Sequence, residues 1–211
     1  MAETPEPLEA PDAKQRLLDA AERVFAAKGF EAATVREICR EAGANIAAIN
    51  YYFGDKERLY VEALKRAHAC ADDTGLGEPV LEWPSGTPPV QKLRDFIREM
   101  ASRMHAPARV SAMQLLMREM ADPSPAGRQV IVEFIRPKAF GLRAILEELL
   151  PSLDPQKRMM VGFSVMGQLL FYRQNRPVVE LIFGKEQVDA LGAEMVIDHV
   201  TRFTLTALGL S

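Results

Sequence analysis

The residues best suited to contact another molecule lie in one short stretch, residues 46–53, which reads IAAINYYF. The helical spacing of Ile46, Ile49 and Phe53 predicts that these three side chains face the interior. The outer face then carries Ala47, Ala48, Asn50, Tyr51 and Tyr52. Small residues let a helix approach base edges, asparagine pairs with adenine, and tyrosine reaches phosphate or a thymine methyl group. The chemistry that this face favours is readout of a DNA groove.

A preceding helix over residues 35–42 must hold that short helix in place. Thr34 followed three residues later by Glu37 is the capping-box pattern at a helix start. Gly43 suits the left-handed residue that ends a helix, and Asn45 is a second cap, which predicts a short helix over 46–52. Two helices joined by a tight glycine-containing turn form a helix-turn-helix, whose second helix enters the major groove.

Charge alone does not indicate a nucleic-acid-binding protein. The formal net charge is −3, and the cations of the motif (Arg36, Arg40, Lys56 and Arg58) are offset by Glu37, Glu41, Asp55 and Glu57. Lys56 and Arg58 begin the next helix, where cations and free N–H groups meet phosphate. We therefore expect few phosphate contacts per subunit and a moderate salt dependence, with the acidic side chains pointing away from the groove.

A longer pattern surrounds the motif. Residues 14–64, with the runs LLDAAERVFAAKGFEAATV (17–35) and YYFGDKERLY (51–60), resemble the TetR/AcrR-type bacterial transcriptional regulators. The runs QLLMREMADPS (114–124) and LLFYRQNRPVVELIFG (169–184) resemble the CecR-like branch of that family. The resemblance implies a homodimer that binds a palindromic operator in double-stranded DNA as a repressor and is released by a small, largely apolar effector. It also implies a location in the bacterial cytoplasm.

The family's DNA contacts, carried over by position, fall on Thr34, Arg36, Asn45, Ala47, Asn50, Tyr51, Tyr52 and Lys56. In the resemblance, Thr34 and Arg36 touch the DNA backbone or base edges from the first motif helix. Tyr52 and Lys56 clamp phosphates. The family more often has tyrosine at the position of Asn50, so no base is assigned to this side chain.

The remaining pattern predicts an all-α protein, with an N-terminal three-helix DNA-binding head and a larger C-terminal helical domain for ligand binding and dimerisation. We expect an acidic, proline-rich disordered tail (1–12), the head with its connecting helix (13–71), a loop (72–89) and the second domain (90–211). Helices are predicted over about 13–28, 35–42, 46–52, 56–71, 89–105, 107–121, 125–150, 155–173, 178–183 and 185–208. Pro137 should kink or split its helix, and Trp83 should pack back on the second domain.

Two helices of the second domain, over 155–173 and 185–208, are apolar on more than one side. Such helices must be buried on more than one side, which favours a four-helix interface between two copies of the chain. Ordinary burial in the core of a monomer is the alternative. No stretch of about 18 residues is apolar and free of charge, so a membrane span is not expected.

Methionine is concentrated in the second domain, and thioethers adapt to irregular cavities. The predicted effector pocket comprises a stripe of Met113, Leu116, Met117 and Met120, the apolar side chains Phe134, Phe163, Met166 and Phe171, and the polar anchors Gln114, Arg118 and Tyr172. Ordinary core filling remains the alternative for any one methionine.

No phosphate-binding loop, dinucleotide fingerprint or nucleophile motif is present, and the three histidines lie on separate segments. We therefore predict no enzyme activity, no catalytic residue, no cofactor and no metal site. Cys39 lies on the inward stripe of its helix and is expected to be buried. The alternative function is a helical protein that binds a small molecule or a partner protein and has little affinity for DNA.

Overall fold

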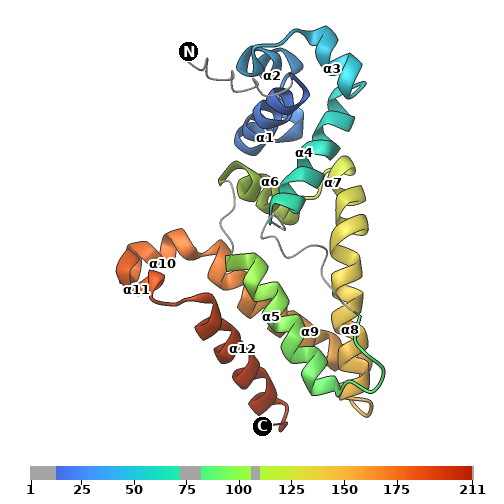
Figure 1. Ribbon diagram of the computed structural model, residues 1–211, viewed down its shortest axis with the longest axis vertical. Coiled ribbons are helices and arrows are strands. Elements are labelled where there is room, and N and C mark those ends of the chain that lie inside the picture. Colours follow the sequence, from blue (N-terminus) through green and yellow to red (C-terminus); the bar gives the residue numbers. More distant parts are fainter. Residues whose placement is uncertain (1–12, 72–81, 106–109, 211) are drawn as a thin grey trace, which may run out of the picture. The chain divides into compact units, whose positions relative to one another are not determined.

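The computed structural model describes residues 13–71, 82–105 and 110–210, and these ranges contain helices and no strand (Figure 1). The predicted tail and residues 72–81 of the predicted loop lie outside them. The α-helices are α1 Ala13–Ala32, α2 Val35–Ala42, α3 Ile46–Tyr52, α4 Lys56–Ala71, α5 Pro89–His105, α6 Val110–Ala121, α7 Pro125–Val130, α8 Arg136–Leu149, α9 Pro155–Gln174, α10 Arg176–Phe183, α11 Lys185–Asp189 and α12 Ala193–Ala207. A π-helical turn, η1 Ile131–Ile135, joins α7 to α8.

The chain divides into two compact units, and the division differs from the boundary expected from sequence. The first unit combines the chain up to His68 with α6 and α7, and we call it the head unit. The second contains α5, η1 and α8 to α12, and we call it the C-terminal unit. The sequence expectation placed α6 and α7 in the second domain. Their packing groups them with the head, because α6 lies against α1.

Apolar side chains at helical spacing form the core of the head unit. Leu17, Phe25, Ile38, Ile49 and Leu59 are each at most 1% exposed, and α1 packs against α2, α3 and α6. These contacts fix the helices of the motif against a common support.

Two local details of the head refine the prediction. Gly29 leaves helical geometry at φ 77° and ψ 175°, as expected from its position at the predicted end of the first helix. The expectation that Ile46 faces the interior was wrong, because this side chain is 45% exposed at the first position of α3. A first-turn residue projects beyond the packed face of so short a helix.

The C-terminal unit is organised around α5, which packs against α8, α9 and α12 (Figure 1). Its core includes Leu93, Phe96, Ile97, Leu142, Ile145, Val165, Leu169, Val196 and Val200. Trp83 packs against this core, as predicted, and its Nε1–H donates to Asp95 Oδ2 at 3.2 Å. The predicted split near Pro137 is confirmed, since η1 interrupts the helix before the proline in the first turn of α8.

The single helix predicted over 185–208 was wrong. The structure has α11, a break at residues 190–192, and then α12. Gly192 occupies the N-cap of α12 with extended geometry, φ −63° and ψ 162°. Glycine is unfavourable inside a helix, and here it marks a boundary. Within the described residues, no helix combines the length and apolarity needed to cross a membrane.

Candidate nucleic-acid interface

The first motif helix, α2, is fixed at both ends by the residues that the sequence indicated. The Thr34 hydroxyl accepts from the Glu37 N–H at 3.3 Å, and Glu37 Oε2 accepts from the Thr34 N–H at 3.2 Å. Gly43 ends the helix in the left-handed conformation, φ 62° and ψ 38°. Ile38 and Cys39 are buried, so α2 has one anchored face and one exposed face. The predicted capping box and the predicted burial of Cys39 are confirmed.

The second motif helix, α3, presents the predicted outer face. Asn45 Oδ1 accepts from the Ala48 N–H at 2.9 Å, which starts the helix. Ala47 and Asn50 are exposed, and Tyr51 is 83% exposed. Its ring meets that of Tyr52 edge to face at 4.9 Å between centroids. The arrangement presents a small residue, an amide and a phenol on one short helix, which is the chemistry that reads base edges and phosphates.

The carboxylates of the motif are engaged by cations from α1. Lys28 Nζ lies 2.5 Å from Glu37 Oε1, and Arg23 Nε lies 2.5 Å from Glu41 Oε1. The hydrogen bond from Lys28, followed by those from Thr34, lowers the pKa of Glu37 to about 2. Glu37 and Glu41, which offset the cations of the motif in the sequence, therefore pair with cations of α1 and not with the arginines of α2.

Arg36 and Arg40 are the two exposed arginines of α2, and neither has an ion-pair partner among the residues that the structure describes. A guanidinium without a carboxylate partner is available for phosphate. Arg40 was not among the predicted contacts. Its spacing of four residues from Arg36 places both on one side of the helix, and that signal was present in the sequence.

The first turn of α4 is more engaged than the sequence suggested. Lys56 Nζ donates to the carbonyl of Glu31 at 3.4 Å and lies 4.5 Å from the centroid of the Phe30 ring. Arg58 lies 3.7 Å from Asp55, whose Oδ1 also caps the helix by accepting from the Arg58 N–H at 2.8 Å. The Lys56 ammonium would have to exchange these contacts for a phosphate contact, so its predicted role remains a prediction.

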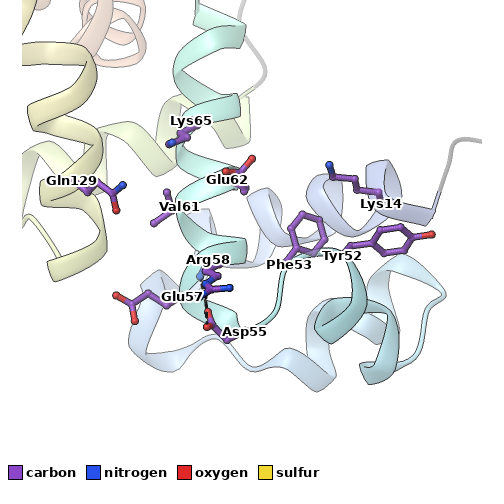
Figure 2. Close-up of a pocket in the computed structure, with 10 residues that line it drawn as sticks. All are labelled: Lys14, Tyr52, Phe53, Asp55, Glu57, Arg58, Val61, Glu62, Lys65 and Gln129. Atoms are coloured by element: carbon purple, nitrogen blue, oxygen red, sulfur yellow. Dashed lines mark hydrogen bonds and ion pairs between the residues drawn. The ribbon is translucent and has the colours of Figure 1, made fainter.

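A hollow of about 640 Å³ borders the same turn and runs along α4 (Figure 2). Figure 2 shows Lys14 and Tyr52 at one end and Gln129 of α7 at the other. Its charged lining residues are Lys14, Arg58 and Lys65 with Asp55, Glu57 and Glu62. These opposite charges balance, so the hollow has neither the apolar lining of an effector pocket nor a net charge for an ionic ligand.

The predicted effector residues are divided between the two units. Met113, Gln114, Leu116, Met117, Arg118 and Met120 lie on α6 of the head unit, while Phe134, Phe163, Met166, Phe171 and Tyr172 lie in the C-terminal unit. The buried side chains of α6 are Ala112, Leu115 and Glu119, and Met120 is 41% exposed. The methionine stripe is therefore not the inward stripe of its helix.

Two of the predicted residues, Phe171 and Tyr172, line a cavity of about 330 Å³ within the C-terminal unit. Its other lining residues are Arg176, Val179, Phe183, Gln187, Val188 and Leu191. The lining is mostly apolar with a few polar groups, the composition usual for small-molecule sites. Among the described residues, no group of three or more His, Cys, Asp or Glu side chains has the arrangement of a metal site.

Comparison with known proteins places this geometry in a family. Residues 17–63 match the model of bacterial regulatory proteins of the TetR family, and residues 89–208 match that of the C-terminal domain of the HTH-type transcriptional dual regulator CecR. The chain belongs to the TetR family and has a CecR-type C-terminal domain. The second match begins at α5 and includes α6 and α7, so it follows the boundary expected from sequence rather than the packing units.

Relatives of similar length are transcriptional regulators. The chain is 28% identical to the HTH-type transcriptional dual regulator CecR of Shigella flexneri over 94% of this chain and 93% of that protein. It is 29% identical to the HTH-type transcriptional regulator BetI of Rhizobium meliloti over 78% and 79% of the two chains. The solved structure of the fatty acid degradation regulator FadR from Bacillus halodurans matches with a TM-score of 0.56 and 18% identity, over 89% of this chain and 97% of that one. This last likeness shows the fold alone.

Proposed function

We propose that this TetR-family protein is a homodimeric repressor of transcription that binds a palindromic operator through α3. In this proposal, Ala47, Asn50 and Tyr51 face the groove. Release follows when a small, largely apolar effector binds the C-terminal unit and favours a state in which the two recognition helices no longer match the half-site spacing.

The observation that carries the proposal is the outer face of α3. Tyr51 is 83% exposed, while α3 itself is held by the Asn45 cap and by the buried Ile49. A rigid short helix that exposes an aromatic and an amide side chain is suited to recognition rather than to core formation. Arg36 and Arg40 of α2, which have no ion-pair partner within the described part of the chain, supply cations for the phosphates beside it.

Exposed apolar side chains on two helices support dimerisation. Met159, Met160, Phe163 and Phe171 of α9 and Met195 and Phe203 of α12 are each more than half exposed. Large apolar side chains gathered on neighbouring helices and left exposed in one copy are typical of a homodimer interface. A two-fold axis through these helices would duplicate the recognition helix, as a palindromic site requires.

Support for an apolar effector comes from the cavity lined by Phe171 and Tyr172 and from the name of the FadR relative, which concerns fatty acid degradation. Aromatic walls with an arginine and a glutamine at hand suit a ligand that is mainly hydrocarbon.

Selection of bound fragments from the genomic DNA of the source organism tests the DNA-binding step. We expect the purified protein to enrich a palindromic sequence and to bind it at least about a hundredfold more tightly than random duplex, with a preference that persists as salt rises. The double variant Asn50→Ala/Tyr51→Ala is the matched control, because both side chains are exposed and their removal leaves the fold intact.

Enrichment of no sequence, or equal enrichment by the control variant, would exclude α3 as a reader of DNA. Tight binding of a hydrophobic ligand by a protein that does not shift DNA at low salt would favour the alternative function, a helical small-molecule-binding protein.

A further inference from the structure

A buried carboxylate joins α6 to α4 and to the start of α7 within the head unit, and neither the DNA contacts nor the proposed pocket makes use of it. Glu119 of α6 is 5% exposed. One of its oxygens, Oε1, accepts a hydrogen bond from the hydroxyl of Tyr60 on α4. The other, Oε2, accepts from the N–H of Ser124 at 3.0 Å and from its hydroxyl at 3.1 Å. A charged group buried in this way must have its hydrogen bonds satisfied, so its position is tightly specified.

Tyr60 extends this contact towards the recognition helix. It is fully buried, and its ring lies 4.7 Å from that of Phe25 and 5.0 Å from that of Phe30, measured between centroids. The Phe30 ring in turn lies 4.5 Å below the ammonium of Lys56, the first residue of α4. Only residues 53–55 separate that lysine from the end of α3. The phenol is therefore packed into a layer of aromatic rings that contacts the first residue of α4.

Ser124 extends the contact in the other direction, into α7. Its hydroxyl accepts from the N–H of Gly127 at 3.0 Å and so caps this helix. The chain passes from α7, in the head unit, through η1 into α8, in the C-terminal unit. The head unit and the C-terminal unit are thus joined by a segment whose first turn is tied to Glu119.

Gly127 shows how closely the carboxylate is fitted. A Cβ atom placed on this glycine would lie 1.5 Å from Glu119 Oε2 and 2.4 Å from its Cδ. Only glycine at this position leaves room for the carboxylate, and a methyl group would force the end of the Glu119 side chain away from Ser124. The geometry needs four residues, Tyr60, Glu119, Ser124 and Gly127, which we call the carboxylate latch.

We infer that Glu119 is a positioning residue for DNA binding, which ties Tyr60 of α4 to Ser124, the residue that caps α7, so that a displacement of α7 changes how firmly the recognition helix is held. The inference rests on the proposed function. In that function an effector binds the C-terminal unit and weakens DNA binding by the head unit. The carboxylate latch transmits this effect. Glu119 does not touch DNA in this proposal. It acts through Tyr60 and the aromatic rings that contact Lys56, the first residue of α4, which follows α3 after residues 53–55.

Two small substitutions test the latch. Tyr60→Phe removes only the hydroxyl, and Gly127→Ala adds a methyl group that must push the Glu119 carboxylate away from Ser124. Both should weaken binding to the selected operator about tenfold or more, because each breaks or displaces a buried charge-assisted hydrogen bond. The double variant should bind no more weakly than the worse single variant, since both act on the same carboxylate.

A second measurement separates positioning from general stability. Amide hydrogen exchange over residues 46–58 should be faster in both variants, while exchange in α5 and α9 stays unchanged. Circular dichroism must show both proteins fully folded at the temperature of the binding assay. The conservative variant Glu119→Gln should retain part of the operator affinity, because the amide keeps one acceptor oxygen for Tyr60.

Ser111→Ala is the matched control. The Ser111 hydroxyl donates to Glu22 Oε1 at 2.6 Å, so it is also a hydrogen bond to a glutamate between two helices of the head unit, here α6 and α1, at the opposite end of α6. Operator affinity in this variant should stay within about twofold of wild type, because Ser111 is not one of the four residues of the carboxylate latch. An equal loss in Ser111→Ala, or affinity within twofold of wild type in both Tyr60→Phe and Gly127→Ala, would overturn the inference. A wild-type protein that binds no duplex would instead overturn the proposed function.

Discussion

At the scale of single residues, the decisive fact about the head is which cation each carboxylate uses. Glu37 is bound by Lys28 and by Thr34, and these hydrogen bonds lower its pKa from the ordinary 4.5 to about 2. The ionised form of the Glu37 carboxylate is therefore more stable in the folded state than in the unfolded chain. Its contribution to stability is therefore present above about pH 4.5 and is lost as the pH falls towards 2.

Carboxyl-resolved NMR checks this expectation directly. Glu37 should titrate near pH 2 in the wild-type protein, and Lys28→Met should move its pKa back towards 4.5, because the largest cause of the shift is then removed. A Glu37 signal that titrates near 4.5 in the wild type would contradict the pairing. It would also mean that the Glu37 carboxylate is free to offset the charges of Arg36 and Arg40.

Tyr51 and Arg40 should differ in the kind of DNA binding that they support. Tyr51→Ala should cost about 1–3 kcal/mol on the selected operator and much less on random duplex, because the exposed phenol faces the bases in the proposed complex. Arg40→Ala should weaken both duplexes about equally and reduce the slope of log affinity against log salt by about 1. Titrations of both duplexes at several salt concentrations separate the two outcomes, and a Tyr51 variant with unchanged preference would remove that residue from the interface.

At the scale of elements, the termini of α2 and α3 follow from local chemistry. Gly43 is left-handed at φ 62°, and no atom outside its immediate neighbours lies within 4 Å of the position of its missing Cβ. Gly43→Ala should therefore destabilise the protein by about 1–2 kcal/mol through backbone strain alone. Gly192 has equal space around it but an ordinary φ of −63° at the N-cap of α12, so Gly192→Ala meets no left-handed strain and should cost only about 0.5 kcal/mol, the lower preference of alanine for an N-cap. Thermal unfolding of the two variants side by side measures the difference, and equal melting temperatures would contradict the assignment of strain.

The elements that the sequence predicted well are those whose signals are local. The caps at Thr34 and Asn45 and the split near Pro137 involve residues within a few positions of one another. The inward face of α6 was not predictable in this way. Glu119 is a glutamate among methionines, and its burial depends on Tyr60, which is 59 residues earlier in the chain. Helical periodicity predicts that a glutamate at this position is exposed to solvent. Glu119 is buried because its partner Tyr60 comes from a distant part of the sequence.

At the scale of the whole molecule, the same limit applies to the division into units. The sequence pattern and the family model both place α6 and α7 with the C-terminal domain, since the chain there is continuous with α8. Packing of α6 against α1 groups them with the head, and long-range contacts of this kind leave no periodic trace in the sequence. The segment of α6 and α7 is continuous in sequence with the C-terminal unit but packs with the head unit. In our proposal, the carboxylate latch in this segment therefore couples the two units.

The oligomeric state is the last property to test, because the proposed function needs two recognition helices. Phe163 of α9 is 65% exposed, and Phe163→Glu places a charge at the centre of the proposed interface. We expect sedimentation equilibrium at micromolar concentration to show a dimer for the wild type and a monomer for this variant. Val110→Glu, at a 72% exposed position on α6, is the control and should leave the dimer intact. The monomeric variant should bind the full operator about a hundredfold or more weakly than wild type, because the second half-site no longer profits from a high local concentration of head units. If it bound the full operator as tightly as the wild type, recognition would need only one copy of α3, and the palindromic operator would have to be abandoned even with the DNA-reading face left in place.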